Sequence, residues 1–167
     1  MAHASEKKIL VIDDEPDVRE FLSTCLADAG FQVETAGDGF DALMKVEQSP
    51  PDLITLDLLM PRISGIKLMR KIRKNPAWKK IPVVIVTAHA KDEFGQNDLE
   101  QLYAEEVRPV PEHIIEKPIT PTRLVNGIGK ILDVQTNIDV AVERSDILEM
   151  IKNCSPGKLK EIQSLLY

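Results

Sequence analysis

Long hydrophobic runs are missing from this chain of 167 residues, and so are the sequence signals of export. No apolar stretch approaches the roughly 20 residues that a helix needs to cross a bilayer, so we expect no membrane-spanning segment. The first residues, MAHASEKK, lack the apolar segment of a secretory signal. The two cysteines do not have the spacing of a metal site. These absences predict a cytoplasmic protein with reduced thiols.

An excess of positive charge is also missing. The 27 acidic residues outnumber the 21 lysines and arginines and give a formal net charge of -6, which argues against nonspecific nucleic-acid binding. Lysines and arginines do cluster in residues 65–75, but Trp78 is the only aromatic residue nearby and cannot form a stacking platform for bases by itself. We therefore interpret that basic cluster as a solvent-facing helix surface. No glycine-rich loop follows the first predicted strand, which argues against a dinucleotide site.

What the sequence does contain is a regular alternation of strand and helix patterns. Short apolar runs predict strands at 8–13, 31–36, 52–57, 81–88 and 113–117, and helical periodicity predicts helices at 15–30, 40–48, 65–75 and 120–132. Such an alternation predicts an α/β fold in which helices cover both faces of a parallel sheet. Ligands of these sheets bind outside the carboxyl ends of the strands.

Chemically active side chains stand at the ends of four of the five predicted strands. They are Asp13 and Asp14 at the end of the first strand, Asp57 at the end of the third, Thr87 at the end of the fourth and Lys117 at the end of the fifth. Each has an ordinary explanation: the aspartate pair could cap a helix, the threonine could lie in a turn, and the lysine could face solvent. Their shared position at one edge of the sheet favours a functional site instead.

The chemistry of these residues suits a divalent cation and a phosphoryl group. Clustered carboxylates repel one another unless a cation lies between them, and Mg²⁺ prefers hard oxygen ligands of this kind. Asp57 could then be a metal ligand or a nucleophile that forms an aspartyl phosphate. Lys117 would neutralise charge on the phosphoryl oxygens, and Thr87 would donate a hydrogen bond to one of them.

Four motifs, VIDDEPD, DLLMPRISG, VIVTA and EKPIT, resemble in this order the receiver domain of bacterial two-component response regulators, over about residues 8–132. The resemblance implies a flavodoxin-like, doubly wound, five-stranded parallel sheet in the order 2-1-3-4-5. It implies that Asp57 accepts a phosphoryl group from a histidine kinase, and that Thr87 and Lys117 contact the phosphoryl oxygens. It also implies a Mg²⁺ site. Its ligands would be Asp14 and Asp57 directly, Asp13 through water, and the backbone carbonyl of Leu59.

The sequence departs from this family at two places. Thr87 and Lys117 are 30 positions apart, more than expected, and Ile114 stands where an aromatic switch residue is usual. After the predicted receiver domain at 1–132, residues 133–167 form a short extension with two predicted helices. With six acidic and four basic residues, this tail is too short and has the wrong charge for a DNA-binding domain.

The sequence thus predicts a stand-alone response regulator that is phosphorylated on Asp57 and signals through protein contacts, without enzymatic turnover. Its expected partners are a sensor histidine kinase or phosphotransfer protein and an unidentified downstream protein, with no DNA or membrane; a homodimer through the tail or the fourth–fifth strand face stays open. One alternative is a binding module that works without phosphorylation, which Ile114 and the unusual segment 88–112 favour. A less favoured alternative is a Mg²⁺-dependent aspartyl-phosphate phosphatase. Such enzymes need a second aspartate where this chain has Leu59.

Overall fold

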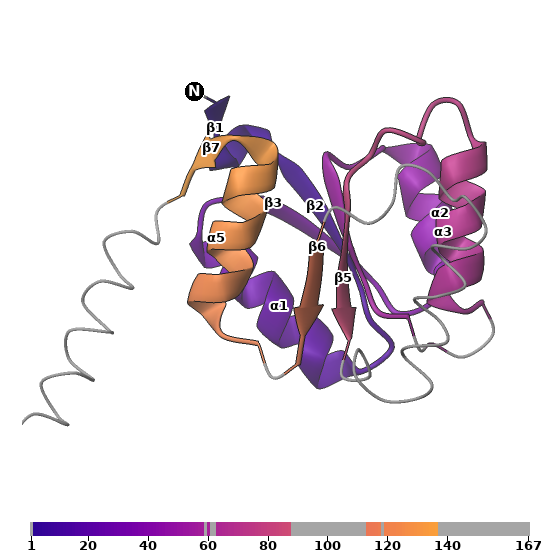
Figure 1. The fold of residues 1–167 in the computed structure, drawn as a ribbon, viewed down its shortest axis with the longest axis horizontal. Coiled ribbons are helices and arrows are strands. Elements are labelled where there is room, and N and C mark those ends of the chain that lie inside the picture. Colours follow the sequence, from indigo (N-terminus) through magenta and orange to yellow (C-terminus); the bar gives the residue numbers. More distant parts are fainter. Residues whose placement is uncertain (1, 59, 61–62, 88–112, 118, 137–167) are drawn as a thin grey trace, which may run out of the picture. The chain divides into compact units, whose positions relative to one another are not determined.

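Five parallel strands form the centre of the structure (Figure 1). They are β2 (Lys8–Ile12), β3 (Gln32–Ala36), β4 (Leu53–Leu56), β5 (Val83–Thr87) and β6 (His113–Glu116). Their order across the sheet is β3-β2-β4-β5-β6, and every neighbouring pair is parallel. Counted within this sheet alone, that is the predicted order 2-1-3-4-5, which is confirmed.

The computed structural model describes residues 2–58, 60, 63–87, 113–117 and 119–136. These residues belong to one compact unit, Met1–Thr136. The long segment 88–112, Leu59 and the tail from residue 137 lie outside the described residues, so the predictions made for them stay predictions.

Helices cover both faces of the sheet, as expected for a doubly wound fold. On one face lie α1 (Pro16–Asp28) and α5 (Pro121–Leu132), which contact each other, and on the other lie α2 (Gly39–Gln48) and α3 (Gly65–Lys74) (Figure 1). Because both faces are covered, the central strands read as continuous apolar runs instead of alternating ones. All residues of β4 and β5 are buried. Burial of each large apolar side chain contributes about 1.5–3 kcal/mol, so the middle of the sheet is held rigidly.

The helix ends are fixed by local signals that are visible in the sequence. Ser64 caps α3 by accepting a hydrogen bond from the Lys67 N–H at 3.4 Å, and Thr120 caps α5 in the same way through Arg123 at 3.3 Å. Gly30 follows α1 with a φ of 103°, a backbone conformation that side chains disfavour. Serine and threonine are preferred N-cap residues, and glycine is preferred just after a helix. A cap of this kind contributes about 1 kcal/mol.

A second, two-stranded sheet was not predicted. It pairs β1 (Ala2–His3) in parallel with β7 (Val134–Gln135), and a 3₁₀ turn, η1 (Ala4–Glu6), connects β1 to the main sheet. Strands of two residues are too short to produce a hydrophobic period. The described structure therefore continues to Thr136, whereas the domain division at residues 132 and 133 stays a prediction.

Gly65 is a position where the fold tolerates no side chain. A Cβ atom there would lie 2.5 Å from the carbonyl oxygen of Asp57 and 2.7 Å from the Cα atom of Leu58. Both are backbone atoms, so no side-chain rotation relieves the overlap. We expect Gly65→Ala to lower the free energy of unfolding by about 1–3 kcal/mol, measured by urea denaturation.

Gly127, in the middle of α5, is the matched control. A Cβ atom there has Ile115 Cδ1 as its nearest neighbour, at an ordinary 3.9 Å. Gly127→Ala should leave stability unchanged or raise it by about 1 kcal/mol, because alanine favours helix. Equal losses in the two variants would contradict the steric explanation for Gly65.

Candidate functional site

Three side chains that are far apart in the sequence meet at the carboxyl edge of the sheet. Asp13 follows β2, Asp57 follows β4 and Lys117 follows β6. The Nζ atom of Lys117 lies 2.9 Å from Asp13 Oδ2 and 3.7 Å from Asp57 Oδ2. Asp13 is 1% exposed and Asp57 is 4% exposed. The structure thus brings together three of the predicted site residues, and the lysine offsets part of the cost of burying two carboxylates.

Asp57 owes its position to the strand before it. Its backbone N–H donates to the carbonyl of Ile12 at 3.0 Å, which continues the ladder between β2 and β4 by one more residue. Leu56 and Leu58 on either side are fully buried. The apolar run therefore anchors the backbone while the carboxylate stays at the edge. This accounts for an acidic residue inside a hydrophobic stretch.

All the polar groups of Asp13 have hydrogen-bond partners. Its N–H donates to the Ala36 carbonyl at 3.2 Å, and its own carbonyl accepts from Arg19 Nη1 at 2.8 Å. In the side chain, Oδ1 accepts from the Glu15 N–H at 3.0 Å, and Oδ2 accepts from Lys117. Neither aspartate is the N-cap of α1, because Glu15 holds that position and its side chain makes no cap hydrogen bond.

The carboxylates at this edge form a group with the chemistry of a cation site. One oxygen atom from each of Asp13, Asp14, Glu15 and Asp57 lies within 4.8 Å of the others. Hard oxygens in this number and spacing fit Mg²⁺, which takes one or two carboxylates and keeps several waters. Glu15 was not among the predicted ligands, and its only signal in the sequence is its place beside two aspartates. The predicted ligand Leu59 lies outside the described residues.

The carboxylates around Lys117 stabilise its positive charge. Burial by itself lowers the pKa of Lys117. The hydrogen bond that Lys117 donates to Asp13 and the negative charges of Asp57, Asp13 and Glu15 outweigh burial, so the pKa of Lys117 is raised above the usual 10.5. The side chain is therefore an ammonium ion at neutral pH, which is the form that attracts phosphoryl oxygens.

Thr87 ends β5 directly beside Lys117. Its carbonyl accepts the backbone N–H of Lys117 at 3.0 Å, and the residue is fully buried. Thr87 and Lys117 therefore occupy neighbouring strand ends, as the sequence predicts. Contacts of either side chain with a phosphoryl group stay predictions.

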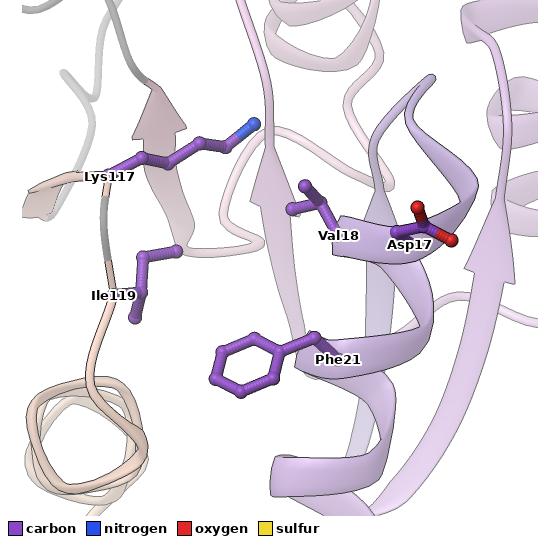
Figure 2. A pocket seen from close by; sticks show the side chains of 5 residues that line it. All are labelled: Asp17, Val18, Phe21, Lys117 and Ile119. Carbon is purple, nitrogen blue, oxygen red and sulfur yellow. The ribbon is translucent and has the colours of Figure 1, made fainter.

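A mostly apolar hollow of about 310 Å³ opens beside the site (Figure 2). Its lining comes from the first two turns of α1 and from the chain after β6: Asp17, Val18, Phe21, Lys117 and Ile119. Phe21 is 42% exposed, so its ring is accessible to a partner. Lys117 thus borders both the carboxylate cluster and an apolar surface that a partner could contact.

Comparison with known proteins decides the family. A family model described as "Response regulator receiver domain" matches residues 9–129, well over half of the chain. This chain belongs to the response regulator receiver domain family. Receiver domains are signalling modules, and the matched range includes the four-carboxylate cluster, Thr87 and Lys117.

Individual relatives agree with this assignment. An uncharacterized 14.6 kDa protein of Leptolyngbya boryana is 30% identical over 125 residues, which cover 75% of this chain and 89% of that protein. The high-resolution structure of the chemotaxis response regulator CheY4 of Vibrio cholerae has a TM-score of 0.64 and 29% sequence identity, over 75% of this chain and 98% of that one. In the described part of the receiver, no helix has the length and apolar character needed to cross a membrane.

Other relatives match this chain over only part of their own length. A probable cyclic di-GMP phosphodiesterase of Vibrio cholerae is 29% identical over 163 residues, which cover 98% of this chain and only 35% of that protein. Several further relatives are likewise covered to 60% of their length or less. The resemblance to the phosphodiesterase therefore concerns about a third of that protein.

Mutual repulsion in the carboxylate cluster leads to a prediction for Asp14, which is partly exposed. With a chelator present, Asp14→Asn should raise the free energy of unfolding, because it removes one of several like charges. With Mg²⁺ at 100 times its dissociation constant, wild type should gain about 2.7 kcal/mol and Asp14→Asn much less. Urea denaturation with and without Mg²⁺ measures both effects.

The exposed carboxylate of Glu20, which lies on α1 outside the cluster, provides the control. Glu20→Gln should leave the response to Mg²⁺ unchanged. If Asp14→Asn lost stability in chelator or kept the full gain with Mg²⁺, the cluster would not be a cation site.

Proposed function

We propose that this receiver domain accepts a phosphoryl group on Asp57 from a histidine kinase or phosphotransfer protein, and signals through protein contacts that depend on phosphorylation. The observation that carries the proposal is the position of Asp57. Its carboxylate is buried at a strand end, 3.7 Å from the ammonium of Lys117 and inside a cluster suited to a cation. A carboxylate needs such surroundings to react with a phosphoryl group that is itself negatively charged.

In the proposed step, a carboxylate oxygen of Asp57 attacks phosphorus on the phosphohistidine of the donor. An O–P bond forms as the N–P bond breaks, and the histidine nitrogen keeps the electron pair and takes up a proton. Lys117 neutralises charge on the transferring oxygens, and Thr87 donates its hydroxyl hydrogen to one of them. Mg²⁺, when bound, supplies further neutralisation; Asp14 and Asp57 would hold it, with Asp13 acting through water and Leu59 through its carbonyl.

This proposal includes the absence of steady enzymatic turnover and a cytoplasmic location without DNA or membrane binding. The phosphatase alternative is disfavoured because the required second aspartate is replaced by Leu59. A binding module that works without phosphorylation would have no need for a buried carboxylate beside Lys117 within a cluster suited to a cation.

Phosphorylation itself is tested with acetyl phosphate and Mg²⁺. We expect wild type to gain one phosphoryl group, detected by intact-protein mass, and Asp57→Asn to gain none, because an amide is not a nucleophile toward phosphorus. Glu20→Gln should be labelled like wild type. Labelling of Asp57→Asn would show that the acceptor lies elsewhere, and an unlabelled wild type would favour the binding module.

The apolar hollow beside Lys117 suggests where the donor protein docks. A donor must bring its phosphohistidine to the edge of the sheet that carries Asp57, and the exposed ring of Phe21 lies beside this edge on α1. Phosphotransfer can be profiled against a panel of purified autophosphorylated histidine kinases from the same organism. We expect Phe21→Ala to slow transfer from the fastest kinase about tenfold, the effect of losing a central apolar contact.

Met44 on α2 is an equally exposed apolar residue, 44% against 42%, and it does not line the hollow. Met44→Ala should transfer at the wild-type rate, and Phe21→Ala should still be labelled normally by acetyl phosphate. Equal transfer rates for the two variants would place the donor elsewhere on the receiver.

A further inference from the structure

Arg19 reaches back from the second turn of α1 to the loop that carries the carboxylate cluster. Its Nη1 atom donates to the carbonyl oxygen of Asp13 at 2.8 Å. The guanidinium lies over Gly37, at the end of β3, where a Cβ atom would be 3.2 Å from Nη1 and 3.6 Å from Cζ. The missing side chain of Gly37 therefore provides the space in which the guanidinium lies.

The contact with Asp13 fixes more than one atom. The carbonyl of Asp13 and the nitrogen of Asp14 belong to the same planar peptide group. Holding the oxygen therefore sets the direction in which the chain enters Asp14. On the other side of Asp13, the N–H is held by the carbonyl of Ala36. The backbone of Asp13 is thus held through both its N–H and its carbonyl group, just before Asp14.

We propose that Arg19, placed against Gly37, is a positioning residue for the divalent-cation site, acting through the peptide group between Asp13 and Asp14. The inference rests on the cation site of the proposed function. It adds β3, whose end carries no predicted ligand, to the elements that build the site. Mutation of a group that orients metal ligands without touching the metal commonly lowers metal affinity by a factor of about 10 to 100.

Because Arg19 is positively charged, the inference can be tested by the direction in which the Mg²⁺ dissociation constant changes when Arg19 is replaced. A guanidinium near a bound Mg²⁺ repels it, so if Arg19 were only a nearby charge, its removal would tighten Mg²⁺ binding. If Arg19 positions Asp14, its removal weakens binding although repulsion is relieved. The two roles therefore predict opposite changes in the dissociation constant.

The experiment is calorimetric titration of the full chain with Mg²⁺, without a phosphodonor. We expect Arg19→Met, which keeps the length of the side chain but has no donor, to raise the dissociation constant on the order of tenfold. Arg19→Lys should recover part of the loss, because an ammonium can still donate to the carbonyl of Asp13. Gly37→Ala should give a smaller loss of the same sign, since it displaces the guanidinium and leaves every charge in place.

Arg123, exposed on α5, is the matched control for charge, and Arg123→Met should leave the dissociation constant unchanged. Urea denaturation in chelator separates affinity from global stability; if Arg19→Met did not fold, Arg19→Lys and Gly37→Ala would decide by themselves. Unchanged or tighter Mg²⁺ binding in the Arg19 variants overturns the inference and leaves the proposed function intact. Failure of wild type to bind Mg²⁺ overturns both the inference and the proposed cation site.

Discussion

The balance of charge around Lys117 is the constraint on which the site depends. One ammonium ion faces Asp13, Asp57 and Glu15 at 2.9, 3.7 and 3.6 Å, and two of these carboxylates are largely removed from water. The lysine offsets the desolvation of one carboxylate well and of a second partly. The cluster therefore keeps an excess of negative charge, which a divalent cation would neutralise.

The fold can hold such a cluster because the strands behind it are rigid and apolar. In a parallel sheet every strand ends at the same edge, so residues distant in sequence become neighbours there. The buried strands β4 and β5 fix the backbone just before Asp57 and at Thr87. The close contact at Gly65 brings the start of α3 against the carbonyl of Asp57. Stability and chemistry thus share the same backbone segments.

Helix α1 serves the site on two of its sides. Toward the sheet, Arg19 holds the loop of the carboxylates, and toward solvent, Phe21 lines the hollow that borders Lys117. Contact of a partner with the exposed ring would therefore act on the helix whose Arg19 is proposed to orient the cation ligands. The proposed docking residue Phe21 and the proposed positioning residue Arg19 thus lie within two turns of the same helix.

The sequence by itself determined the elements, their order and the residues at the strand ends, because apolar periodicity, caps and strand ends are local patterns. It therefore placed Asp13, Asp14, Asp57, Thr87 and Lys117 at one edge, and family resemblance then supplied their expected roles. Only the tertiary structure decided the contacts between segments: Arg19 over Gly37, Glu15 within the carboxylate cluster, and β1 beside β7. Such contacts depend on how helices and loops pack in three dimensions, and no spacing along the chain encodes the distance between atoms of separate elements.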